Sequence, residues 1–161
     1  MAGKTGTMRV VTDVHMPTLR QATADDWPGI RALLTNNGLP VDDLGPDRLD
    51  GFLVAEDGGV LAGLIGLQVL GTTGLLRSLV VAEAARRAGL GGKLVGALES
   101  AAETAGIREL WLLTIDADGF FERQGFEIVE RTVAPDSIRG TEEFSGLCPE
   151  SAFLMMKALP T

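Results

Sequence analysis

The sequence has very few of the side chains that bind metals or act as nucleophiles. Its 161 residues include a single cysteine, Cys148, and a single histidine, His15. One cysteine excludes a disulfide within the chain and a cysteine-based metal cluster. One histidine argues against a zinc site and against a His-based catalytic triad. The sequence therefore predicts no metal cofactor.

Basic side chains and long apolar runs are also scarce. Lysine and arginine total 14 against 22 aspartates and glutamates, which gives a net charge of −8. Such a surface is a poor general partner for nucleic acid or an anionic membrane, so any anion has to be held locally. No apolar run approaches the ~20 residues of a membrane-spanning helix. Because the first residues also lack the apolar core of a secretory signal, we expect a cytoplasmic protein.

The apolar periodicity predicts one mixed α/β domain over residues 18–161, preceded by a flexible leader over residues 1–17. A chain of this length can bury roughly 70% of its unfolded surface in one core. A strand–helix–strand crossover over residues 75–115 implies two parallel neighbours in an otherwise antiparallel, twisted sheet flanked by helices. The predicted order is a strand and a helix over 18–38, three antiparallel strands over 51–81, a helix over 90–105, a strand over 108–115, a short helix over 116–125, a strand over 127–133, a short helix from Pro135 and a last strand over 151–159.

The most informative segment joins the third of these strands to the long helix, and reads VAEAARRAGLGG over residues 81–92. Three glycines so close together disfavour the start of a helix, yet they remove Cβ atoms where a ligand touches the backbone. The first N–H groups of the helix have no partners and carry partial positive charge, which suits a pyrophosphate beside Arg86 or Arg87. The alternative is a glycine-tolerant turn with solvated arginines. Leu94 stands where the Walker and dinucleotide motifs each need another residue, so neither motif fits.

On these residues the chain resembles the GNAT N-acetyltransferase superfamily. The signature Arg/Gln-x-x-Gly-x-Gly/Ala is matched by Arg86, Gly89 and Gly91, although Glu83 and Arg87 replace the family's usual proline and glycine. LRQATADDWPGIRALL resembles the opening strand and helix of the family, and FFERQGFEIV resembles its final Tyr-x-x-x-Gly-Phe block. The resemblance implies a single-domain GNAT fold with acetyl-CoA as co-substrate.

A finer resemblance is to the small GNAT branch associated with arsenic-resistance genes. It rests on GLLRSLVV, LWLLT and GFFERQGF, and on the long tail over residues 134–152. For the cofactor, the GNAT resemblance implies that backbone amides of the central strand hold the pantetheine arm, while the loop and helix start hold the pyrophosphate. The residues implied in cofactor binding are Leu79, Val80, Val81, Arg86, Arg87, Ala88, Gly89, Leu90, Gly91, Gly92, Thr114 and Phe121.

The catalytic groups of the family are not all present. Many relatives protonate the leaving thiolate with a tyrosine where this chain has Phe121, and the chain contains no tyrosine. Gln68 occupies a strand position where relatives sometimes carry a general base, and an amide is not a base. The family's asparagine is here Thr114, which is either a hydrogen-bonding group near the cofactor or a β-branched strand end. A water, another hydroxyl or thiol, or positioning alone has to replace the missing acid.

Three further positions are candidates. Cys148 is a candidate acid, substrate sensor or arsenical ligand, or else a small buried apolar residue. Arg77 interrupts an apolar strand, so it is either buried against a substrate carboxylate or a tail glutamate, or it lies on an exposed sheet face. Glu142 and Glu143 are candidates for a base or a substrate clamp, or they form a solvated helix face.

We therefore expect an acyl-CoA-dependent N-acetyltransferase that acts on the primary amine of a small molecule, either amino-acid-like or an organoarsenical. Direct transfer in a ternary complex is favoured over an acyl-enzyme on Cys148. A CoA-binding sensor without turnover is the alternative, and Phe121 and Gln68 favour it. The resemblance also implies a homodimer.

Overall fold

The computed structural model describes residues 17–86, 89–147 and 151–160, which form one seven-stranded sheet in the order β3-β4-β5-β6-β7-β9-β8. Neighbouring strands are antiparallel except for β6 and β7, which run parallel. The predicted mixed fold with its parallel pair is confirmed. The strands are β3 Thr18–Gln21, β4 Phe52–Asp57, β5 Val60–Leu70, β6 Thr73–Val81, β7 Glu109–Thr114, β8 Glu127–Val129 and β9 Phe153–Ala158.

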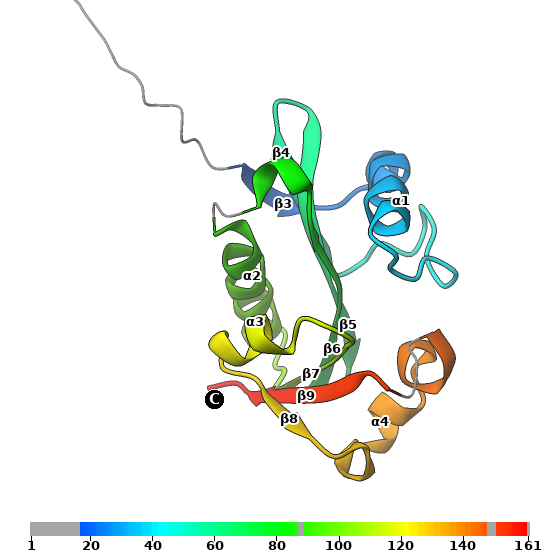
Figure 1. Ribbon diagram of the computed structural model, residues 1–161, viewed down its shortest axis with the longest axis vertical. Coiled ribbons are helices and arrows are strands. Elements are labelled where there is room, and N and C mark those ends of the chain that lie inside the picture. Colours follow the sequence, from blue (N-terminus) through cyan, green and yellow to red (C-terminus); the bar gives the residue numbers. More distant parts are fainter. Residues whose placement is uncertain (1–16, 87–88, 148–150, 161) are drawn as a thin grey trace, which may run out of the picture.

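Helices cover both faces of the sheet. α2 (Leu90–Thr104) and α3 (Asp118–Arg123) lie on one face, and α1 (Trp27–Asn36) and α4 (Asp136–Arg139) lie on the other (Figure 1). Separate apolar clusters fill the two sides, one beneath α2 and α3 and two beneath α1 and α4. The sheet is therefore the middle layer, and an opening in it is accessible from two directions.

The long helix and the first helix follow their apolar periods. In α1, Ile30 and Leu34 are buried, and Thr23 and Asp26 form a capping box ahead of the helix. In α2 the buried side chains are Leu90, Leu94, Val95, Leu98 and Ala102. Ala101 and Ala105 continue the apolar spacing of this helix in the sequence but are exposed.

The C-terminal part differs from the prediction in one element. The predicted strand over residues 127–133 ends at Val129 and continues as a 3-10 turn, Arg131–Val133. The ladder between β8 and β9 stops where Val129 faces Leu154, one residue from the start of β9 at Phe153, so most of the residues predicted beyond Val129 have no β9 residue to pair with. A short π-helical turn, Glu143–Leu147, follows α4 and brings the tail back over the α1 side of the sheet.

Strand β6 is irregular at the point where the site forms. Leu64 of β5 faces Val80, whereas Gly66 faces Arg77, so β6 carries one extra residue between these pairs. This β-bulge contains Ser78, whose φ of 62° is the one positive value outside glycine in the described part of the chain. The β6–β7 ladder is limited to Thr73–Leu75 opposite Glu109–Trp111. Beyond these residues the two strands separate.

Candidate active site

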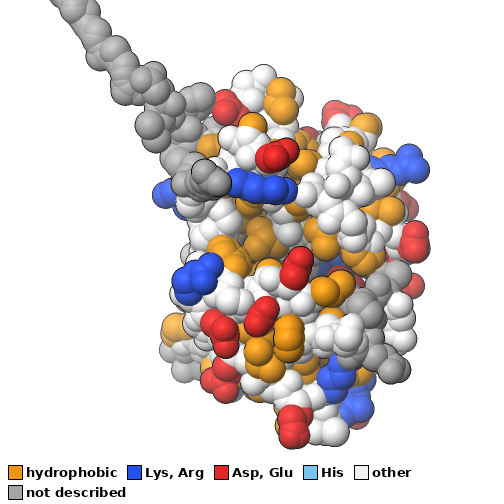
Figure 2. Space-filling model, viewed as in Figure 1, with side chains coloured by type: hydrophobic (Ala, Val, Ile, Leu, Met, Phe, Trp, Pro, Cys, Tyr) orange, Lys and Arg blue, Asp and Glu red, His pale blue; other side chains and the backbone are white. Residues whose placement is uncertain are grey.

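The separated ends of β6 and β7 form the walls of a cleft of about 350 Å³. Around its mouth, hydrophobic side chains gather in a hollow near the middle of the face shown in Figure 2. The lining comes from both sides of the sheet, with Phe121 of α3 on one side and Asn37 at the end of α1 on the other. The remaining lining residues are Gly38, Leu39, Pro40, Leu76, Arg77, Ser78, Leu79, Leu112, Leu113, Thr114, Ile115, Asp116, Ala117 and Glu143.

Thr114 and Phe121 hold the β7–α3 corner of the cleft. The Thr114 hydroxyl accepts a hydrogen bond from the Ala117 backbone N–H at 3.0 Å, which fixes the turn into α3. The Phe121 ring is 5% exposed and packs edge-on against Phe120 and Phe126, with centroids 5.1 and 5.6 Å apart. A phenyl ring has no proton to give, so the side chain at this corner shapes the cleft and leaves any acid role to another group.

The loop before α2 has the backbone form expected of an anion site. Gly89 precedes the helix with a φ of 77°, a left-handed conformation that glycine adopts without strain. Lys93 donates to the Gly89 carbonyl at 3.2 Å, so the N–H groups of Leu90, Gly91 and Gly92 come before this first helical bond. Arg86 donates from Nε to the Val81 carbonyl at 3.1 Å and from Nη2 to Asn37 at 2.8 Å.

One glycine in this loop has a structural reason that the sequence did not suggest. A Cβ on Gly91 would lie 3.2 Å from the Phe120 ring, tighter than an ordinary contact. The residue therefore lets α2 pack against α3, besides any approach of a ligand to the backbone. Arg87 and Ala88, which were also expected in this loop, lie outside the described residues, as does Cys148.

Arg77 is buried, with 5% of its surface exposed, so the exposed-face interpretation is wrong. Its guanidinium makes a two-armed ion pair with Asp43, in which Nη2 lies 2.9 Å from Oδ1 and Nη1 contacts Oδ2. Its Nε donates to the Ser78 hydroxyl at 3.1 Å, at the bulge. Asp43 lies in the loop after α1 and was missed, because an aspartate in a polar loop has no periodicity that indicates burial.

Glu143 joins this cluster from the tail. The residue is 5% exposed, and its Oε1 lies 3.9 Å from Arg77 Nε. Burial raises the pKa of Glu143, and the negative charge of Asp43 raises it further, while Arg77 opposes the shift. The solvated-face interpretation is therefore wrong for Glu143, although it holds for the exposed Glu142.

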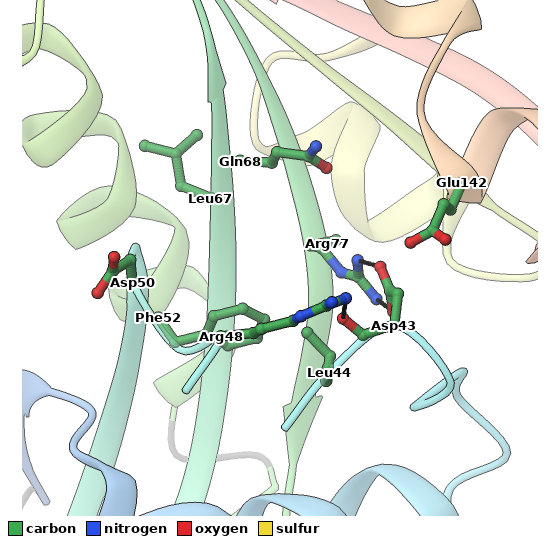
Figure 3. Close-up of a pocket in the computed structure, with 9 residues that line it drawn as sticks. All are labelled: Asp43, Leu44, Arg48, Asp50, Phe52, Leu67, Gln68, Arg77 and Glu142. Atoms are coloured by element: carbon green, nitrogen blue, oxygen red, sulfur yellow. Dashed lines mark hydrogen bonds and ion pairs between the residues drawn. The ribbon is translucent and has the colours of Figure 1, made fainter. Parts of the chain in front are cut away.

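A second cavity, of about 230 Å³, lies on the other side of Arg77 (Figure 3). Arg77 lines both this cavity and the cleft. Arg48 lies beside it and donates to the Asp43 carbonyl at 3.3 Å, and Glu142 faces the cluster from the tail. Besides these, the cavity is lined by Asp43, Leu44, Asp50, Phe52, Leu67 and Gln68.

Residues 17–86, 89–147 and 151–160 contain no group of three or more His, Cys, Asp or Glu side chains placed to hold a metal ion. Within the same ranges, none of the helices combines the length and the apolar character that crossing a membrane requires.

A family comparison covers most of the residues that form the cleft. The model of the acetyltransferase (GNAT) family matches residues 16–126. The chain belongs to this family. The match includes both walls of the cleft and the Gly89 loop, whereas the GNAT domain's tail, with Glu143, lies beyond it.

The chain is similar to a curated N-acetyltransferase over part of its length and, at low sequence identity, to solved structures that share its fold. An uncharacterized N-acetyltransferase of Chlorobaculum tepidum is 36% identical over 63 residues, which are 39% of this chain and 40% of that relative. N-acetylglutamate synthase of Neisseria gonorrhoeae, solved with coenzyme A and N-acetyl-glutamate, has a TM-score of 0.77 and 22% identity over 98% of this GNAT chain and 38% of its own. Rv2747 of Mycobacterium tuberculosis, solved with CoA, has a TM-score of 0.75 and 24% identity over 89% of this chain and 100% of its own. This chain thus spans less than half of the first two proteins, and the structural likeness establishes the fold.

Proposed function

We propose that this GNAT domain transfers the acetyl group of acetyl-CoA to the primary amine of a small, amino-acid-like molecule by direct transfer. The observation that carries the proposal is one cleft whose walls come from both faces of the sheet. Two reactants that enter from opposite faces meet there without a covalent enzyme intermediate. Holding both reactants in one geometry supplies much of the rate acceleration.

The α2 side of the cleft has the groups that an acyl-CoA requires. The N–H groups of Leu90, Gly91 and Gly92, together with Arg86, suit the diphosphate. Beyond Leu75, β6 is not paired with β7, which leaves backbone groups over Leu79–Val81 to accompany the pantetheine arm. Acetyl-CoA supplies the activated acetyl group, and these residues orient it.

The second cavity suits the rest of the acceptor. Its lining carries both signs of charge, because Arg48 lines it together with the carboxylates of Asp50 and Glu142, and such a lining is complementary to a zwitterion. Arg77 stays paired with Asp43, so it shapes the passage between cavity and cleft and is not available as a substrate clamp. The neisserial synthase was solved with an acetylated amino acid, which supports an acceptor of this class. An amine-bearing organoarsenical is the second acceptor to test, because of the resemblance to the arsenic-associated branch.

A thiol-release assay tests the proposal. The purified chain is mixed with acetyl-CoA and a panel of amines that includes amino acids, polyamines and an amine-bearing organoarsenical, and CoA thiol is followed over time. Acceptor-dependent thiol with an amino acid or the organoarsenical supports the proposal. A thermal shift with CoA but no acceptor-dependent thiol would instead support a non-catalytic sensor, which the aromatic ring of Phe121 favours. No thermal shift with CoA would contradict both functions.

A further inference from the structure

The buried cluster around Arg77 contains more negative charge than that arginine needs. Asp43 already engages both terminal nitrogens of the guanidinium, and the Ser78 hydroxyl accepts from Nε. Glu143 therefore adds a second buried carboxylate, 3.9 Å from Nε and beyond hydrogen-bond distance. In the described part of the chain the Glu143 carboxylate has no hydrogen-bond donor to match it, and burying a carboxylate in this way costs free energy, so this glutamate is not explained as a counterion.

The position of Glu143 is that of a group that serves the cleft. It lines the cleft together with Ser78 of the bulge and Thr114 of the opposite strand. The charged groups that act on it are Arg77 from β6 and Asp43 from the loop after α1. Asp116 is the other carboxylate of the cleft lining in the described residues, and it is exposed at the end of β7. Surplus buried charge in a cleft is the arrangement expected of a functional group.

We propose that Glu143 is the general base of this GNAT domain and takes a proton from the ammonium group of the acceptor. The inference rests on the proposed function. Glu143 accepts one proton from R–NH3⁺, which leaves the nitrogen lone pair free to attack the thioester carbon. A C–N bond forms, the C–S bond breaks, and the second proton leaves the nitrogen and ends on the CoA thiol. Glu143 then returns its proton to solvent.

The environment of Glu143 suits this role. An ordinary glutamate is too weak a base to deprotonate an ammonium efficiently, and a base works best when its pKa lies close to the operating pH. Burial raises the pKa of Glu143 and so makes it a stronger base than an ordinary glutamate. The base form is the ionised one, so kcat/KM should increase with pH through the pKa of Glu143. A tail that brings a glutamate to the cleft thus replaces the base that is missing at Gln68.

The inference also predicts an unusual relation between stability and activity. A carboxyl whose folded pKa is raised stabilises the fold below its unfolded pKa, and this stabilisation is lost as the pH rises through the folded pKa. At a pH above the folded pKa, the ionised Glu143 is a cost to the folded state. In that pH range Glu143→Gln should therefore leave the unfolding midpoint unchanged or raise it, while it removes the base.

The test compares Glu143→Gln with Glu103→Gln, a matched control on the exposed side of α2, and with Asp116→Asn in the cleft. We expect Glu143→Gln to lower kcat about 100-fold, to abolish the acid limb of the kcat/KM profile, and to leave the CoA-induced thermal shift intact. Glu103→Gln should match the wild type, and Asp116→Asn should keep the acid limb. Glu143→Asp, which retains a carboxylate one methylene further away, should keep the limb with reduced kcat, and it decides the question if the glutamine variant does not fold.

The outcomes separate this inference from the proposed function. If the wild type releases thiol and Glu143→Gln keeps both its rate and its acid limb, Glu143 is not the base and the acetyltransferase stands. The same conclusion holds if Asp116→Asn removes the limb in place of Glu143→Gln. If the wild type acetylates none of the amines, the proposed function fails and this assignment fails with it.

Discussion

Replacing Asp43 by asparagine should lower the free energy of unfolding, and the geometry of the buried Arg77 cluster indicates by how much. The side chains of Arg77 and Asp43 are 4% and 10% exposed, so their ion pair is almost fully desolvated. Removing one partner of a buried pair typically costs about 3–5 kcal/mol, because the other charge is left uncompensated. Asparagine still offers an oxygen, and Glu143 remains 3.9 Å from Arg77, so we expect about 3 kcal/mol.

The same substitution should reverse the contribution of Glu143. With Asp43 neutralised, Glu143 becomes the counterion of Arg77, and its pKa should fall relative to the wild type because one neighbouring negative charge is gone. Adding Glu143→Gln to Asp43→Asn should then destabilise the protein by about 1–2 kcal/mol at pH 8, within the usual range for contacting residues. In the wild-type background Glu143→Gln should be neutral or stabilising. This change of sign is the distinctive result.

Urea unfolding at pH 8 measures the stabilities of the wild type, the two single variants and the double variant. Asp42→Asn, a substitution at an exposed neighbour in the same loop, is the control. For a domain of this size, 3 kcal/mol corresponds to a fall of about 6–12 °C in the thermal midpoint. Equal stability of Asp43→Asn and the wild type would refute the picture of Arg77 as a buried charge held by Asp43. Equal destabilisation by Glu143→Gln in both backgrounds would show that Glu143 is an ordinary counterion.

Three further substitutions test other parts of the structure. Arg86→Ala should weaken CoA binding about tenfold in calorimetry, because one charge-assisted contact is lost. An unchanged affinity would contradict the proposal that the loop before α2 binds the diphosphate of CoA. Gly91→Ala places a methyl group 3.2 Å from the Phe120 ring, so we expect a loss of about 1–2 kcal/mol in chemical unfolding, whereas unchanged stability would show that the ring moves aside freely. The hydrogen bond from Arg20 lowers the pKa of Asp26 to about 2. The pair should therefore stabilise the fold above pH 4 by about 1 kcal/mol, a value discounted because Arg20 is partly exposed. In pH-dependent unfolding this contribution should disappear as the pH falls towards 2, and it should be absent from Asp26→Asn at every pH.

The elements that follow a local pattern could be predicted from the sequence. The meander of β4, β5 and β6 and the helix α2 were found because alternation and the 3.6-residue period are local signals. The strand predicted over 127–133 was too long, because its alternation continues past the point where β9 begins at Phe153 and can no longer pair with it. Pairing partners belong to the tertiary structure, and a sequence pattern does not indicate where they end.

The charged cluster could be predicted only in part. An arginine inside the apolar strand LLRSLVV indicates that a buried guanidinium needs a partner, and the tail glutamates were among the candidates. Asp43 is 34 residues from Arg77 in the chain and lies in a loop without periodicity, so nothing local distinguishes it from Asp42. The bulge at Ser78 was equally invisible, because a serine in a strand gives no sign of a left-handed backbone.

These two missed features share one physical origin. The bulge adds a residue to β6 just past the end of the β6–β7 ladder, where a bulged strand bends, and it places the Ser78 hydroxyl beside Arg77 Nε. An arginine held in this way at an opening in the sheet has to be neutralised from outside its own strand, since that strand contains no carboxylate. The loop after α1 and the tail each bring a carboxylate to it, and one more carboxylate arrives than the charge requires. The opening of the sheet and the proton acceptor beside it are therefore consequences of the same distortion, so a variant that straightens β6 should lose both together.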